Sequence, residues 1–181
     1  VDASGTRVHM IDQFFFAVSR SLNWDALVHT FMRQLLQRNG FQVPPEPEQF
    51  TYRAIAEYNG DDELLLRQTV RRLLRDNVFR DFAMAKDFRL ALLRLCADAL
   101  EAHADRQPES LAVRQWLTGE LRLISALKPA LIFQKIARNN ARDMFVSLAH
   151  WLRLCGKQGL VVSLDVSRYV LDRRPNDGSL F

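Results

Sequence analysis

The chain has 181 residues, 48% of them hydrophobic, which is enough to bury the core of one domain or of one domain plus part of another. This composition excludes a globally disordered chain. The net charge is +4, and the basic residues are arginines except for Lys86, Lys128, Lys135 and Lys157. Because arginine suits contacts with carboxylates and phosphates, the charge permits an acidic partner or nucleic acid.

The sequence also indicates the compartment. No apolar run approaches the roughly 20 residues that span a bilayer, and the N-terminus has no signal-peptide pattern, so we expect a soluble, cytoplasmic protein without membrane contact. Cys96 and Cys155 lie far apart on apolar helical faces, which predicts buried, reduced thiols. The four histidines share no close spacing with each other or with the cysteines, so no zinc site is predicted.

The first two predicted helices cover residues 8–20 and 24–39. In the second, Leu27, Phe31 and Leu35 share one face, Asn23 is the expected N-cap and Gly40 is the residue that ends the helix. We expect the two helices to form a hairpin. The proline-rich stretch that follows cannot continue a helix, so residues 41–48 are a candidate boundary within the helical region.

A short helix is predicted over residues 49–58, ended by Asn59 and Gly60, and a longer helix begins in the acidic residues 61–63. The longer helix has an apolar stripe that we expect to be buried, made of Leu66, Val70, Leu73 and Leu74.

The other face of this helix is rich in arginine. Arg67, Arg71 and Arg75 recur at every fourth residue and therefore align, with Arg72 beside them. This face is either solvated and salt-bridged to neighbouring acids, or a contact strip for phosphate or an acidic partner. The three aligned arginines are the candidate partner-binding residues.

Three further helices are predicted over residues 81–102, 108–117 and 131–155, the last with a bend or a break near residues 138–140. The first and last of them carry apolar faces, made of Phe88, Leu92, Leu95, Cys96 and Ala99, and of Ala141, Phe145, Leu148, Leu152 and Cys155. We interpret Trp116 and Trp151 as core anchors rather than as platforms for stacking nucleic-acid bases. Residues 1–155 are thus predicted as a helical region, and the fold class as mainly α.

Residues 159–165, Gly-Leu-Val-Val-Ser-Leu-Asp, form a short apolar run that ends in an acid. This pattern is typical of a buried strand whose carboxylate lies at the C-terminal edge of a parallel sheet. It is the pattern of a Walker B strand, in which the aspartate helps to hold Mg²⁺ against nucleotide phosphates. An acid that only caps the next turn is the alternative. Asp165 is the candidate cofactor-binding and metal-binding residue.

The phosphate loop that accompanies a Walker B strand, Gly-x-x-x-x-Gly-Lys-Ser/Thr, does not occur in the sequence. Gly156 and Lys157 do not form one, because Trp151 holds the upstream glycine position and Gln158 replaces the Ser or Thr. A single strand also cannot satisfy its own backbone groups. We therefore expect a fragment of a longer protein, in which residues 156–181 give a strand and turn of an incomplete α/β core. Residues 1–4 are a candidate tail of an adjacent strand.

The C-terminal half carries a family resemblance. Residues 116–120 (Trp-Leu-Thr-Gly-Glu), 136–142 (Ile-Ala-Arg-Asn-Asn-Ala-Arg), 148–156 and 159–165 follow one another in this order. The stretch from 116 to 181 resembles the P-loop ATP-binding proteins associated with BREX-type bacteriophage defence systems, and residues 1–9 match the same family more loosely. In that family a helical region lies between the phosphate-loop portion and the Walker B strand. The resemblance implies a helical insert and partial core of an AAA-like P-loop α/β fold.

By this resemblance Asp165 takes the Walker B position, and the full-length protein binds ATP and Mg²⁺. Its expected partners are other proteins of a DNA-linked phage-defence system, DNA and further copies of itself. Val166 stands where the family often has a catalytic glutamate, so the full-length protein is a candidate ATPase while this fragment alone is expected to be inactive. The competing hypothesis is a non-enzymatic helical module that binds protein or nucleic acid through its arginine-rich face.

Overall fold

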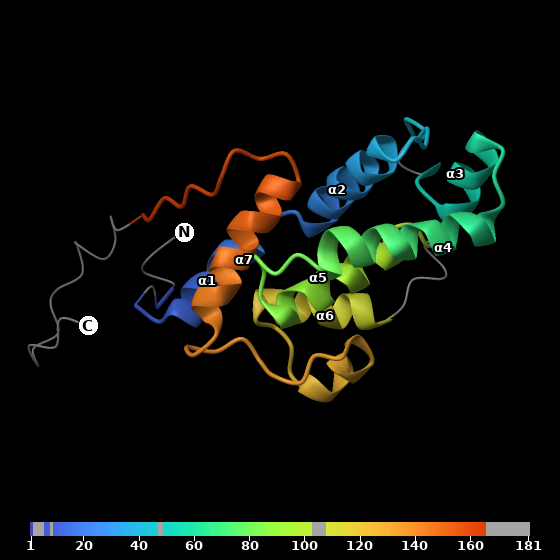
Figure 1. Ribbon diagram of the computed structural model, residues 1–181. Coiled ribbons are helices and arrows are strands. Elements are labelled where there is room, and N and C mark those ends of the chain that lie inside the picture. The colour runs from blue at the N-terminus through green and yellow to red at the C-terminus, as the bar shows by residue number, and fades with distance from the viewer. Residues whose placement is uncertain (2–5, 8, 47–48, 103–107, 166–181) are drawn as a thin grey trace, which may run out of the picture.

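The computed structural model describes residues 1, 6–7, 9–46, 49–102 and 108–165, and it is mainly helical, as the sequence predicts (Figure 1). In chain order the elements are α1 (Ile11–Arg20), α2 (Trp24–Arg38), α3 (Tyr52–Asn59), α4 (Glu63–Leu74), the π-helical turn η2 (Arg75–Phe79), α5 (Lys86–Asp98), α6 (Pro108–Thr118), the 3-10 helix η4 (Ile124–Ala130) and α7 (Ala141–Leu154). None of the helices within these ranges combines the length and the apolar character needed to cross a membrane.

Local chemistry sets several helix ends. Asn23, Thr51 and Asp62 each precede a helix, and each side chain accepts a hydrogen bond from the backbone N–H three residues later, at 3.0–3.2 Å. Such caps satisfy N–H groups that have no partner inside the helix. Gly40 and Gly60 follow α2 and α3 with φ angles of 86° and 70°, a left-handed backbone that glycine adopts without strain. The predicted ends of α2 and α3 are confirmed.

Helix α5 lies at the centre of the helical body, in contact with α2, α4 and α6, while α1 packs against α6 and α7 (Figure 1). The expected hairpin of the first two helices is therefore wrong, because α1 and α2 pack mainly against different partners. The largest fully buried side chains belong to one core, and they are Trp116, Trp151, Phe15, Phe88, Met32, Leu36, Ile55, Leu66, Leu92, Leu100, Leu117 and Leu127. Trp116 and Trp151 are core anchors, as predicted.

The apolar faces predicted for α4 and α5 are confirmed, since Leu66, Val70, Leu73, Leu74, Phe88, Leu92, Leu95, Cys96 and Ala99 are all buried. Helix α5 begins only at Lys86, however, and not near residue 81. Residues 80–85 form a loop instead, in which the Asp81 side chain accepts a hydrogen bond from the Ala83 N–H at 3.1 Å. A side chain that bonds its own backbone in this way competes with helix formation.

The proline-rich connection is fastened to its neighbours. Arg33 of α2 donates to the Pro44 carbonyl at 3.0 Å, and the Asn59 side chain both accepts from and donates to the backbone of Gln42 at 2.8 Å. Phe50, which follows the connection, lies 4.9 Å from the ring of His29. The described part of the connection is thus held between α2 and α3, and the boundary at residues 41–48 stays a prediction.

The predicted helix over residues 131–155 is correct only from Ala141 onward, and residues 131–140 are irregular. Leu131 has a φ of 58°, which ends the 3-10 helix and prevents a helical continuation. The Asn140 side chain then accepts from the Ala137 N–H at 2.8 Å and donates to the Lys135 carbonyl at 3.0 Å. Ile132 and Ile136 are both buried and lie four residues apart, so their spacing in the sequence is also that of a buried helix face.

The predicted buried strand over residues 159–165 is wrong in the described part of the chain, where the segment is extended but forms no regular strand. Leu160 and Val162 pack against the core, whereas Val161 is 92% exposed and Leu164 is 46% exposed. A strand needs backbone partners along its length, whereas the hydrogen bonds between this segment and Val1 involve only its last three residues. Val166 and the turn predicted after it lie outside the described residues.

Candidate functional site

Asp165 lies exposed at the end of the extended segment. Its backbone N–H donates to the Val1 carbonyl at 2.9 Å, and the Val1 amino nitrogen donates to the Ser163 carbonyl at 2.7 Å. Val1 is therefore hydrogen-bonded to the residues before and after Leu164, which is the pattern of parallel strand pairing. Val1 and the extended segment at the other end of the helical body meet here. The candidate strand tail at residues 1–4 stays a prediction, because residues 2–5 lie outside the described part.

Arg67 is a half-buried structural group. Its guanidinium binds both carboxylate oxygens of Glu101 at 2.6 and 3.0 Å, contacts Glu63 at 2.9 Å and lies 4.2 Å from the ring centroid of Tyr52. The hydrogen bonds that Arg67 donates to the Glu101 carboxylate raise the pKa of Arg67 above its ordinary value, so the charge is permanent. Burial, together with the Glu101 carboxylate, raises the pKa of Tyr52 to about 12. Arg67 thus ties α3 and α4 to the residues that follow α5.

The other arginines of the predicted strip remain accessible. Arg71 and Arg72 are exposed in the last turn of α4, and Arg75 is exposed while it contacts Asp76 at 3.3 Å. For Arg67 the structure shows the salt-bridged alternative, and for Arg71 and Arg75 partner binding stays a prediction.

Sequence reasoning missed the segment that follows α4. The chain makes a π-helical turn, η2, in which the Arg80 N–H donates to the Arg75 carbonyl five residues earlier at 3.1 Å. Single π-turns of this kind are frequent at functional sites. Phe79 and Phe82 lie exposed here, and the Arg89 guanidinium lies 5.8 and 4.7 Å from their ring centroids. Two phenylalanines outside the buried stripe were the available signal.

The loop after this turn is bound to α7. His150 of α7 and Asp81 form a hydrogen bond of 2.7 Å between ring nitrogen and carboxylate. The Ala85 N–H donates to the Ser147 hydroxyl at 2.8 Å, and this hydroxyl donates to the Asp143 carbonyl at 2.6 Å. Both ends of the loop are therefore fixed, so that Phe82 between them is held in place.

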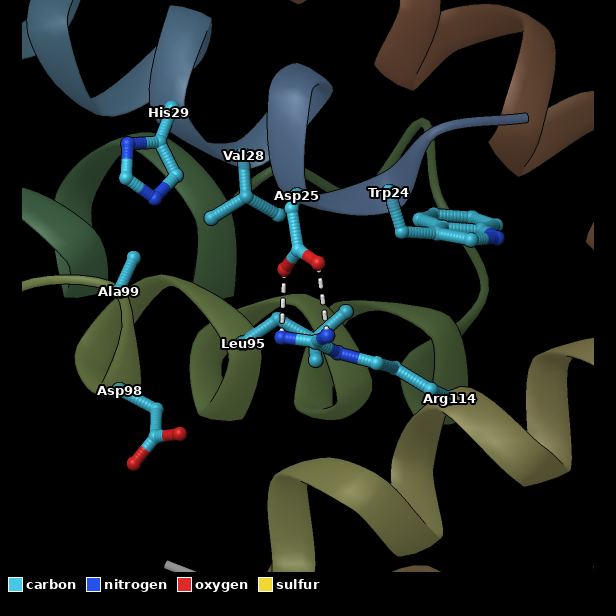
Figure 2. Close-up of a pocket in the computed structure, with 8 residues that line it drawn as sticks. All are labelled: Trp24, Asp25, Val28, His29, Leu95, Asp98, Ala99 and Arg114. Carbon is cyan, nitrogen blue, oxygen red and sulfur yellow. Dashed lines mark hydrogen bonds and ion pairs between the residues drawn. The ribbon is translucent and has the colours of Figure 1, made fainter. Parts of the chain in front are cut away.

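Two hollows lie in the described surface. The first, between α2, α5 and α6, has a volume of about 10 Å³ and is crossed by the ion pair of Asp25 and Arg114, whose facing side chains are joined in Figure 2. It holds no more than a water molecule. The second is a groove of about 360 Å³ between the starts of α5 and α7, where Gln134 donates to Asp87 at 2.6 Å. Neither hollow is lined by Asp165 or by the arginine strip.

Cys96 and Cys155 are free and buried, as predicted. Burial raises the pKa of the Cys155 thiol to about 12 and holds the pKa of Cys96 well above its ordinary value. Neither thiol is a nucleophile at neutral pH, because the reactive form is the thiolate. Within the described ranges, no three side chains of His, Cys, Asp or Glu gather closely enough to hold a metal ion.

Comparisons with protein-family models, with curated proteins and with solved structures find no match for this chain.

Proposed function

We propose that the chain is the helical region and the metal-binding extended segment of a bacterial ATP-binding, AAA-like protein that serves a DNA-linked phage-defence system. The observation that supports this is the parallel pairing of Val1 with the segment that ends at Asp165. In a P-loop fold, core strands are parallel, and an acid that follows one lies at the edge where ligands bind. A helical body whose two ends pair in parallel fits an insert between two neighbouring core strands.

The residues present fit one part of a Mg²⁺–nucleotide site. Asp165 is exposed at the end of its segment, and a carboxylate oxygen is the ligand that Mg²⁺ prefers. Bound Mg²⁺ would neutralise the phosphate charge of ATP. The phosphate loop is absent from the sequence, so this chain supplies one metal ligand and the rest of the full-length protein supplies the cradle. Whether hydrolysis follows depends on a catalytic acid, which we do not assign.

The test is Asp165→Asn in the full-length protein, with Mg²⁺-dependent binding of a fluorescent ATP analogue as the measurement. We expect at least a tenfold loss of affinity in the presence of Mg²⁺ and a small change without it, because the amide keeps the shape but loses the charge. The control is Asp61→Asn, because Asp61 is an exposed acid between α3 and α4. Equal affinities of the two variants would show that Asp165 only caps a turn. The full-length sequence should also contain a glycine-rich phosphate loop within about 60 residues upstream, since such units are compact.

A second candidate function is favoured by the accessible arginines at the end of α4 and the start of η2. In this proposal the chain is a non-enzymatic helical module that binds an acidic protein or nucleic acid through Arg71 and Arg75, with Arg72 beside them. Arg67 has a different role, because its charge is already neutralised by Glu63 and Glu101.

The double variant Arg71→Ala/Arg75→Ala should weaken salt-sensitive binding at least fivefold while leaving the free energy of unfolding within about 0.5 kcal/mol. Arg67→Met should do the opposite. It should lower the free energy of unfolding by about 1–2 kcal/mol, because Glu101 is left partly buried without its partner. Binding titrations at several salt concentrations and urea unfolding measure the two effects. Equal binding by the double variant and the wild type would remove this function.

A further inference from the structure

An aromatic and arginine cluster on the turn after α4 has no role in the nucleotide proposal. It consists of Phe79, Phe82 and Arg89, and we call it the Phe82 platform. Phe82 is 81% exposed, although a phenylalanine gains most when it is buried. A large exposed ring that is held in place is a common feature of binding surfaces.

Contacts with α5 and α7 hold the segment that carries the platform. Arg89 of α5 lies 4.7 Å from the Phe82 ring centroid, and its Nη1 donates to the Phe79 carbonyl. The loop that carries Phe82 is bound to α7 through Asp81 and His150 on one side of the ring and through the Ala85 N–H on the other. A ring held this way loses little conformational entropy when a ligand stacks on it.

The charge around the platform identifies the kind of ligand. Residues 71–89 contain five arginines, one lysine and three aspartates, so this stretch carries a net charge of +3 out of +4 for the whole chain. Two of these arginines lie at the start and just after the end of the turn that carries Phe79. Their side chains are 56% exposed for Arg75 and 63% exposed for Arg80, and both pair with Asp76. Exposed aromatic rings can stack on flat bases, and an excess of basic over acidic side chains attracts a polyanionic backbone. The two features together favour a nucleic acid as the ligand.

We propose that the Phe82 platform binds single-stranded nucleic acid, with a base stacked on Phe82 and the backbone phosphates near Arg75 and Arg80. A single strand fits better than a duplex, because its bases are free to stack on a protein ring. Arg89 supports the ring by a cation–π contact and neutralises part of the phosphate charge. The inference rests on the second candidate function and narrows its partner from any acidic molecule to a single strand.

The experiment uses the chain of 181 residues and a fluorescein-labelled deoxythymidine 20-mer, with anisotropy as the measurement. Phe82→Leu, which keeps an apolar side chain but removes the ring, should weaken binding between about fivefold and a hundredfold. Phe82→Trp should bind as tightly as the wild type or more tightly. The matched control is Phe133→Leu, an exposed phenylalanine in the groove beside α5, which should bind like the wild type. A duplex of the same length should bind more weakly than the single strand.

Several outcomes would overturn the proposal. If Phe82→Leu binds the single strand like the wild type while Arg71→Ala/Arg75→Ala loses binding, the arginine face stands and base stacking on Phe82 does not. If the wild type binds neither probe, nucleic acid is excluded and the arginines are left to an acidic protein. If Phe82→Leu changes the sedimentation of the chain from oligomer to monomer and leaves oligonucleotide affinity unaltered, the ring belongs to a contact between copies.

Discussion

Replacement of Trp116 by alanine is expected to lower the free energy of unfolding by about 4 kcal/mol. The side chain is 2% exposed in the core, so its removal leaves a large cavity. Its Nε1 also donates to the Gln134 carbonyl at 3.0 Å, and this bond fixes the irregular segment before α7. Loss of both the ring and the bond should loosen residues 131–140 before the helices unfold. Urea unfolding followed by circular dichroism measures the stability change, and amide hydrogen exchange locates it.

Two further variants separate the contributions at this site. Trp116→Phe keeps most of the apolar contact and loses the hydrogen bond, so we expect a smaller loss of about 1–2 kcal/mol. Leu111→Ala lies on the same helix with an exposed side chain and should change stability by no more than about 0.5 kcal/mol. Similar losses for Trp116→Ala and Leu111→Ala would mean that α6 does not pack as the structure shows.

Gly119→Ala is the second change with a large expected effect, a loss of about 3 kcal/mol of unfolding free energy. Gly119 follows α6 with a φ of 79°, where an alanine is strained. A Cβ at this position would also lie 2.6–2.9 Å from three ring atoms of Phe16 in α1. Because Phe16 is buried, its ring has little room to move away. The end of α6 can therefore approach α1 only through a glycine, and urea unfolding measures the cost of losing it.

Gly40→Ala is the matched control, since Gly40 has a φ of 86° and nothing lies within 4 Å of its added Cβ. It should show the backbone strain alone, about 1 kcal/mol. Adding Phe16→Ala to Gly119→Ala should cost less than the sum of the two single changes, because the ring that clashes is gone. Equal losses for the two glycine variants, together with simple additivity of the double variant, would rule out the clash.

Features that depend on neighbours in the sequence were predictable. The start of α2 follows from Asn23, because an N-cap bonds the N–H three residues later, and its end follows from Gly40. The buried stripe of α4 was recognised because side chains three and four apart share a helix face. Burial of both cysteines and of Trp116 and Trp151 was recognised for the same reason. Of the candidate site residues, the exposed positions of Arg71 on α4 and of Arg75 at the start of η2 were predictable in this way.

Other features were decided by partners that lie far away in the chain. In the sequence, Arg67 has the same spacing and helix face as Arg71 and Arg75. Only the contact with Glu101, 34 residues later, makes it a half-buried structural group. Helical spacing of apolar residues suggested a helix over residues 131–140, where the bond from Trp116 to Gln134 and the turn at Asn140 stabilise an irregular path instead.

The sequence by itself determined a mainly α protein and the positions of most of its helices, because propensity, caps and apolar periodicity act within one or two turns. The sequence also identified Asp165 as a candidate site residue. Only the tertiary structure decided that the segment before it is extended and hydrogen-bonded to Val1. The same holds for Phe82, which is exposed and in contact with the Arg89 guanidinium. The reason is physical: burial, ion pairing and backbone pairing each depend on which distant groups the fold brings within a few ångströms.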